Sequence, residues 1–209
     1  VYIDTVPCAL SRRRYTYELE KTADSEWQSY TETCETSKKD WGEGLLPMPV
    51  LPHRPEWIDI YKKAWELTWK GIVSSHAMPL QYAYNDYPDN NVTYVWDSCF
   101  CTLFQRYAAV QDMHPCMLTL DNFYKIQQPD GYIPRTFRWT DFDVQYSEKP
   151  CAVGINPPLF SWAEWEYFLI TGNTERLQRV LPGIISNYEF IDNFLQQEPG
   201  FYKWDAGGS

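Results

Sequence analysis

The sequence predicts an all-α fold in which helical hairpins form part of a toroid, preceded by an irregular arm. Along the 209 residues, five or six successive segments carry apolar residues at spacings of three and four, which is the pattern of amphipathic helices. The alternation of polar and apolar residues that marks a half-buried strand is almost absent. The loops between the segments are alternately short and long, as in stacked αα-hairpins, and no fixed repeat period indicates a TPR or HEAT solenoid.

The irregular arm is predicted over residues 1–46, where the chain is polar, mixed in charge and only weakly periodic. It ends in two glycines and a cluster of prolines, which interrupt regular structure. Apolar residues then recur from Trp57 to Ile72 at helical spacing, so a helix is predicted to begin at Glu56. Pro55 lies where a first-turn proline is tolerated.

Helices and loops are then predicted to alternate along the rest of the chain. Residues 80–93 are rich in Asn, Asp, Pro and Tyr, which predicts a loop, and a second long loop is predicted over residues 138–156. A tight turn is predicted at Pro129-Asp130-Gly131, because proline and glycine stand where a reversal requires them. The remaining predicted helices span residues 97–110, 117–127, 157–170, 174–180 and 184–195.

The formal net charge of −10 argues against nucleic acid and anionic membranes as partners, because both select clustered Lys and Arg. No stretch of the sequence approaches the roughly 20 apolar residues of a membrane span, so no membrane partner is expected. The six cysteines form no CxxC pair, and no histidine lies at metal-ligand spacing. We therefore expect neither a metal site nor another cofactor.

Aromatic residues are unusually abundant, with ten Trp, sixteen Tyr and ten Phe spread along the chain. Part of this content must belong to the core, since such rings dominate the energetics of burial. The excess is what a sugar-binding cleft needs. A pyranose has apolar C–H faces that lie flat on indole or phenol rings, and hydroxyl groups that pair with carboxylates, amides and guanidinium groups.

Three junctions place a polar side chain beside an aromatic one at the start of a predicted helix or turn. They read YVWDSCF at 94–100, QQPDGYIPR at 127–135 and INPPLFSWAEWEY at 155–167. They resemble the six-hairpin glycosidases of the trehalase and glycoside hydrolase family 63 group, in which a WDS.F helix start, a DG.IP turn and a QPP helix start line the sugar pocket. The resemblance implies that residues 47–209 are the N-terminal half of an (α/α)6 glycosidase catalytic domain.

The same resemblance implies a set of substrate-binding residues. Trp96 and Asp97 match a sugar-contacting pair, in which Asp97 would accept hydrogen bonds from two adjacent hydroxyl groups. Arg135 occupies the polar position just after the turn, and Asn156 stands where the group usually has glutamine. Trehalases carry an arginine where this chain has Gly154, so trehalose itself is not the favoured substrate.

The catalytic residues are expected outside the chain. The segment GFYKWDAGGS resembles the approach to the SG.D motif whose aspartate is the general acid, so the acid and the later base would both lie beyond Ser209. The resemblance implies inverting hydrolysis of a glucoside- or mannoside-type oligosaccharide by two carboxyl groups. The 209 residues alone are expected to bind sugar without turnover, and a periplasmic or secreted location is expected rather than a cytoplasmic one.

Ordinary structural roles compete for the same side chains. These roles are a core indole for Trp96, a helix N-cap for Asp97, a turn residue for Asp130, a surface ion pair for Arg135, packing for Trp162 and Trp165, and structural or solvated positions for Glu164 and Glu166. Two other functions also stay open. One is a non-catalytic carbohydrate-binding toroid, and the other is a polysaccharide lyase or sugar epimerase of the same architecture.

Overall fold

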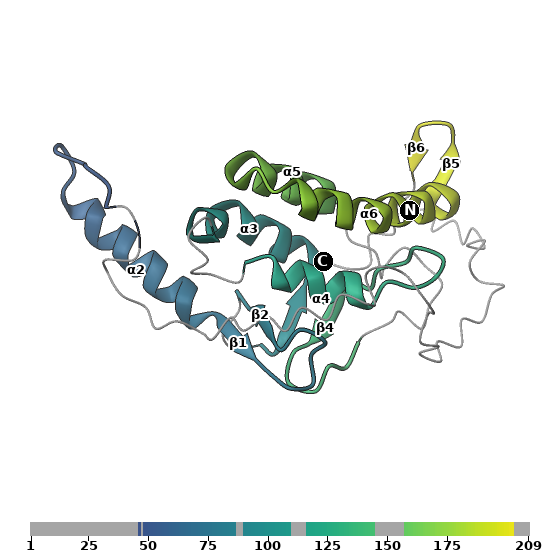
Figure 1. The fold of residues 1–209 in the computed structure, drawn as a ribbon, viewed down its shortest axis with the longest axis horizontal. Helices are drawn as coiled ribbons and strands as arrows, with labels where there is room; N and C mark the ends of the chain where they lie inside the picture. The colour runs from purple at the N-terminus through teal and green to yellow at the C-terminus, as the bar shows by residue number, and fades with distance from the viewer. Residues whose placement is uncertain (1–45, 47, 87–89, 110–115, 145–156, 203–209) are drawn as a thin grey trace, which may run out of the picture.

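The computed structural model describes residues 46, 48–86, 90–109, 116–144 and 157–202, which form a mixed α/β unit (Figure 1). The helices are α2 (Glu56–Lys70), α3 (Val95–Ala109), α4 (Leu118–Lys125), α5 (Phe160–Thr171) and α6 (Thr174–Leu195). The strands are β1 (Ile72–Ser74), β2 (Tyr82–Tyr84), β3 (Val92–Tyr94), β4 (Thr136–Arg138), β5 (Gln196–Glu198) and β6 (Phe201–Tyr202). They pair as β1–β2, β3–β4 and β5–β6 into small antiparallel sheets.

The predicted all-α fold, a partial (α/α)6 toroid, is therefore wrong, because the described residues combine helices with three antiparallel sheets. Each strand has only two or three residues, which is too short for an alternating pattern to show in the sequence. The sequence predicts a loop over residues 80–93, but β2 lies within this segment and β3 begins near its end. The boundary near residue 46 stays a prediction, since residues 1–45 lie outside the described part of the chain.

The predicted helices are confirmed, with small shifts at their ends. Helix α3 begins at Val95 rather than Asp97, and α5 begins at Phe160 rather than Pro157. The two helices predicted on either side of residue 182 form one continuous helix, α6, with Pro182 inside it. A proline removes one backbone N–H from a helix, and here the helical turns on both sides continue across it. Among the described residues, no helix is long and apolar enough to cross a membrane.

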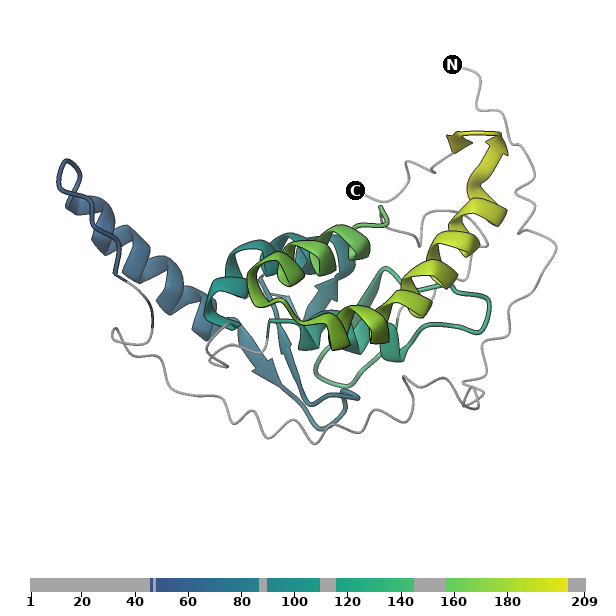
Figure 2. The same ribbon diagram turned by 45° about the horizontal axis from the view of Figure 1, so that its top comes forward.

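Helices α3 and α5 lie side by side and run in the same direction (Figure 2). The rings of Phe100 and Trp162 contact each other near the start of both helices, with centroids 5.7 Å apart. Further along both helices, the guanidinium group of Arg106 pairs with the carboxylate of Glu166. The shared direction places the N-terminal ends of α3 and α5 at the same end of the molecule.

The main core lies beneath these two helices and is built from α3, α4, α5 and the neighbouring strands. Phe123 of α4 and Phe137 of β4 are fully buried there, with ring centroids 4.7 Å apart. Cys99 and Cys116 are buried in the same core, and Cys101 is half-buried. Burial raises the pKa of the Cys116 thiol to about 12, so it acts as a small apolar side chain.

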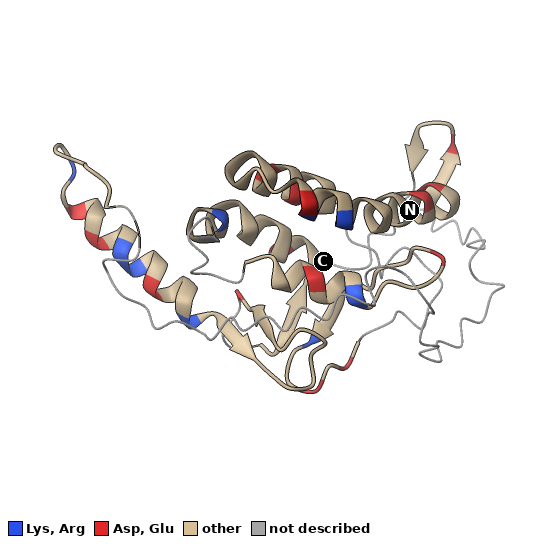
Figure 3. Ribbon diagram, viewed as in Figure 1, with Lys and Arg blue, Asp and Glu red and all other residues tan. Residues whose placement is uncertain are grey.

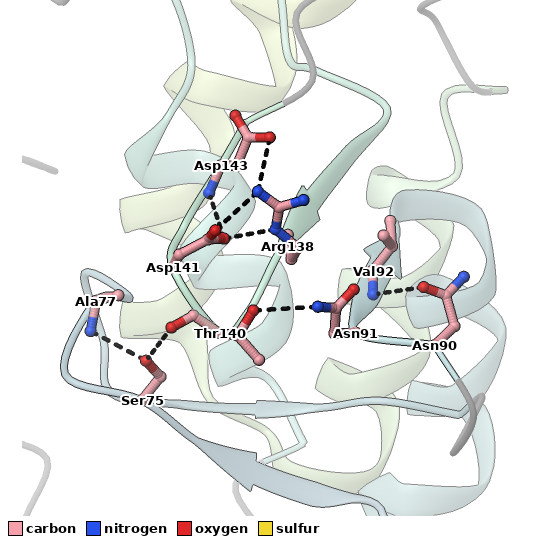
Figure 4. Close-up of polar contacts among 9 residues, drawn as sticks. All are labelled: Ser75, Ala77, Asn90, Asn91, Val92, Arg138, Thr140, Asp141 and Asp143. Atoms are coloured by element: carbon pink, nitrogen blue, oxygen red, sulfur yellow. Dashed lines mark hydrogen bonds and ion pairs between the residues drawn. The ribbon is translucent and has the colours of Figure 1, made fainter.

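Polar side chains secure one end of the β3–β4 pair (Figure 4). The side-chain amide of Asn91 donates a hydrogen bond to Oγ1 of Thr140 at 3.2 Å. Arg138 donates to both carboxylate oxygens of Asp141, at 2.6 and 2.7 Å, and to Asp143 at 3.1 Å. These contacts fold the residues that follow β4 back over the end of the strand pair.

The turn predicted at Pro129-Asp130-Gly131 is confirmed, and it packs directly against α6. A carboxylate oxygen of Asp130 accepts a hydrogen bond from the backbone N–H of Tyr132 at 3.1 Å, so Asp130 is a turn residue. The carbonyl oxygen of Gly131 accepts a hydrogen bond from the side chain of Asn187 at 3.0 Å. Gly131 has a φ of +91° and lies so close to the backbone of Ser186 that no side chain fits.

A buried ion network joins α4, α5 and α6, whose charged residues Figure 3 marks in red and blue. Arg176 donates hydrogen bonds to Asp121 at 2.8 and 3.1 Å and to Glu164 at 2.7 and 2.8 Å. The hydroxyl of Tyr124 donates to Glu164 at 3.0 Å. Glu164 is therefore a structural residue, as the sequence predicts, and so is Glu166 in its pair with an arginine of α3.

Candidate functional site

Two of the three junctions singled out in the sequence meet through the β3–β4 pair. Tyr94, the last residue of β3, pairs with Thr136, the first residue of β4. Directly beyond this pair, the backbone N–H of Val95 donates a hydrogen bond to the carbonyl oxygen of Arg135 at 3.0 Å. The start of α3 therefore lies beside the end of the turn segment, although the two are far apart in the sequence.

Trp96 and Asp97 lie in the first turn of α3 and differ in exposure. The side chain of Trp96 is 44% exposed, so it is not a core indole, whereas Asp97 is half-buried. Helix α3 begins at Val95, which makes Asp97 its third residue, and the interpretation of Asp97 as the N-cap is wrong. An exposed indole next to a partly shielded carboxylate offers one ligand both a stacking face and a hydrogen-bond acceptor.

The surroundings of Asp97 make its carboxylate less stable than it would be in water. Burial raises the pKa of the Asp97 carboxyl above its ordinary value, and the negative charge of Asp86 acts in the same direction. Hydrogen bonds from its own backbone N–H and from the Trp96 side chain oppose this shift in pKa without cancelling it. A partly desolvated carboxylate near a second negative charge favours ligands that donate hydrogen bonds. In the described part of the chain, no group of three or more His, Cys, Asp or Glu could hold a metal ion.

Replacing Asp97 by asparagine is expected to change stability in a pH-dependent way. The pKa of Asp97 is higher in the folded state than in the unfolded state, so the folded chain loses stability as the pH rises through that pKa. Asparagine has no such loss. The melting temperature of Asp97→Asn minus that of the wild type should therefore grow between about pH 3 and about pH 7. A difference in melting temperature that stays constant or shrinks over this pH range would contradict the raised pKa. The control is Asp59→Asn, which makes the same chemical change at an exposed position of α2.

A row of exposed rings leads away from the first turn of α3. The rings of Trp96 and Phe100 lie 6.0 Å apart and those of Phe100 and Trp162 lie 5.7 Å apart, edge to face in both cases. Trp162 is 38% exposed and Trp165 is 52% exposed, so neither indole fills the core, although Trp162 packs against Phe100 and Trp165 packs against Phe168. Trp96 and Phe100 are four residues apart and therefore lie on the same face of α3. No local pattern indicated the contact with Trp162, because it depends on how α5 packs against α3.

The remaining predicted site residues are placed only in part. Arg135 is half-buried, and its backbone borders the start of α3. Asn156 lies outside the described residues, as does Gly154. The structure thus places the backbone of Arg135 beside the first turn of α3, which carries Trp96 and Asp97, and the ring of Phe100 links Trp96 to Trp162 of α5.

Fold and site together define a mixed α/β unit that carries an aromatic–carboxylate pair where a short strand runs into a helix. The chain is similar to an uncharacterized protein of Borreliella burgdorferi, with 24% identity over 153 residues. The match covers 72% of this chain and 31% of the relative, so the chain spans less than a third of the relative's length. No family model matches the sequence, and no solved structure matches the fold.

Proposed function

We propose that the chain is part of a glycoside hydrolase and that Trp96, Asp97 and Arg135 bind a sugar unit of a glucoside- or mannoside-type oligosaccharide. The observation that supports this proposal is the β3–β4 pair, which brings the first turn of α3 beside Arg135. Two of the three segments that resemble the sugar pocket of the trehalase and family 63 group are thereby neighbours in space.

The residue types and their exposure suit a pyranose. The exposed part of the Trp96 indole can stack on the apolar C–H face of a sugar ring. The half-buried Asp97 carboxylate has two oxygens, which can accept hydrogen bonds from two adjacent hydroxyl groups. The guanidinium group of Arg135 would donate a hydrogen bond to a sugar oxygen.

In the proposed reaction these residues bind and orient the sugar, and two carboxyl groups elsewhere in the polypeptide transfer the protons. A general acid protonates the leaving oxygen while a general base activates water on the opposite face of the ring, which requires a separation of about 6.5–9.5 Å between the two groups. The transition state carries positive charge on the ring, so a neighbouring Asp97 anion would also stabilise it.

Hydrolysis of α-glucosides and α-mannosides by the complete gene product tests the proposal. Asp97→Ala is expected to lower kcat/KM by at least about tenfold, because a hydrogen bond to a charged group contributes about 1.5–3 kcal/mol. Trp96→Ala is expected to weaken substrate binding and raise KM. The anomeric configuration of the first product, followed by NMR, should be inverted relative to the substrate.

Asp59→Ala is the matched control, since Asp59 is an exposed aspartate on α2, remote in sequence from the site. Its activity should equal that of the wild type. A kcat/KM for Asp97→Ala equal to that of the wild type would refute the sugar site. Failure of the wild type to hydrolyse any glucoside or mannoside would refute the hydrolase. Glycan binding without turnover that disappears in Asp97→Ala would instead identify a non-catalytic carbohydrate-binding protein.

A further inference from the structure

Helices α3 and α5 share an exposed apolar face that the sugar site does not use. The α3–α5 face consists of Phe100, Phe104 and Tyr107 on α3 and of Trp165 and Leu169 on α5, and each of these side chains is between 40% and 56% exposed. Single exposed apolar residues are ordinary on a protein surface, whereas a contiguous group of large ones marks an interaction surface.

Both helices are apolar on two sides. On α3 the face residues follow one another at spacings of four and three, so they line one side of the helix, while Val95 and Cys99 are buried on another side, in the main core. On α5 the face residues Trp165 and Leu169 are likewise four apart, and Phe160 and Ala163 are buried. A helix that is apolar all round is typical of the interior of a larger protein.

The α3–α5 face offers almost no charge to a partner, and Figure 3 shows both helices mostly in tan. Within these two described helices, the charged residues are Asp97, Arg106, Glu164 and Glu166. Arg106 pairs with Glu166, and Glu164 is buried against Arg176. Asp97 is half-buried and lies at the site end of α3. The face therefore suits an apolar partner surface and not a charged one.

We propose that further helices of the same polypeptide pack on the α3–α5 face. In the relative from Borreliella burgdorferi, the region that matches this chain makes up only 31% of the protein. That protein therefore combines the matched region with much additional chain. Amphipathic helices with apolar residues at spacings of three and four match the ridges of α3 and α5. Because the Phe100 ring contacts Trp96, the docked helices would also border the candidate site.

Leu169→Lys in the complete gene product tests this packing. If helices cover Leu169, the variant buries an unpaired charge, and its melting temperature should fall by at least about 5 °C. If Leu169 faces solvent, the substitution should shift the melting temperature by less than about 2 °C, because most surface substitutions are nearly neutral. The matched control is Asn193→Lys at an exposed polar position of α6, which should leave the melting temperature unchanged.

Hydroxyl-radical footprinting of the wild type adds a measurement that needs no variant. Oxidation of Trp165 should be slower in the native gene product than in urea by at least about tenfold, because the centre of an interface is packed as densely as a protein interior. An unshifted melting temperature for Leu169→Lys, or oxidation of Trp165 at nearly the denatured rate, would overturn the proposal. A dimer in light scattering that Leu169→Lys converts to a monomer would also overturn it, by assigning the face to a second copy of the chain.

Discussion

Replacing Arg176 by methionine is expected to lower the free energy of unfolding by about 3–5 kcal/mol. Arg176 is 5% exposed and lies between Asp121 and Glu164, which are 3% and 1% exposed. Without the guanidinium group, two carboxylates stay buried and lose the four hydrogen bonds that compensate their charges. Urea unfolding followed by circular dichroism measures the loss as a lower midpoint.

Geometry makes arginine specific at this position. Its planar guanidinium group donates two hydrogen bonds to Asp121 and two to Glu164, from helix α6 to α4 and α5. The two carboxylates hold the pKa of Arg176 well above its ordinary value, so the group stays charged throughout the experiment. A lysine ammonium group cannot form two bidentate contacts, so Arg176→Lys should also be less stable than the wild type.

Two controls separate this network from ordinary ion pairs. Arg138→Met removes a half-buried arginine that pairs with the exposed Asp141 and Asp143, and it should lower the midpoint much less than Arg176→Met does. Adding Asp121→Asn and Glu164→Gln to Arg176→Met removes the uncompensated charges and should recover part of the lost stability. A loss for Arg176→Met that is no larger than that for Arg138→Met would contradict the predicted role of the network.

Gly131→Ala is expected to cost more than about 3 kcal/mol of unfolding free energy, from backbone strain and steric overlap together. Gly131 has a φ of +91°, a conformation that residues with a Cβ atom rarely adopt. A Cβ atom added there would lie 2.6 Å from the carbonyl carbon of Ser186 and closer still to its oxygen. Since Gly131 precedes Arg135 in the same turn segment, the substitution should also displace the site and weaken sugar binding.

Gly172→Ala is the matched control for the steric part of this prediction. Gly172 also has a positive φ, of +66°, but nothing lies within 4 Å of an added Cβ atom. It ends α5 in the left-handed conformation that favours glycine, so alanine there should cost only about 1–2 kcal/mol. Thermal unfolding of both variants gives the comparison. Equal losses at the two positions would show that packing against α6 contributes nothing.

Local patterns in the sequence were enough for the helices and for one turn. Apolar residues repeat with the helical period along each of α2 to α6, so every turn of a helix adds evidence for it. Proline and glycine mark the reversal at residues 129–131 by their own backbone preferences. The choice of Trp96 and Asp97 as ligand contacts stays a prediction. The structure adds that neither side chain fills the core or caps the helix.

Only the tertiary structure revealed the strands, the neighbourhood of Arg135 and α3, and the exposure of Trp162. A strand of three residues has no period, and its partner lies in a distant segment, so β3 and β4 are recognised only when they pair. The same holds for Arg176, whose two carboxylate partners belong to different helices. Short-range periodicity therefore determined the elements of this protein, whereas long-range pairing decided which residues meet at its surface and in its core.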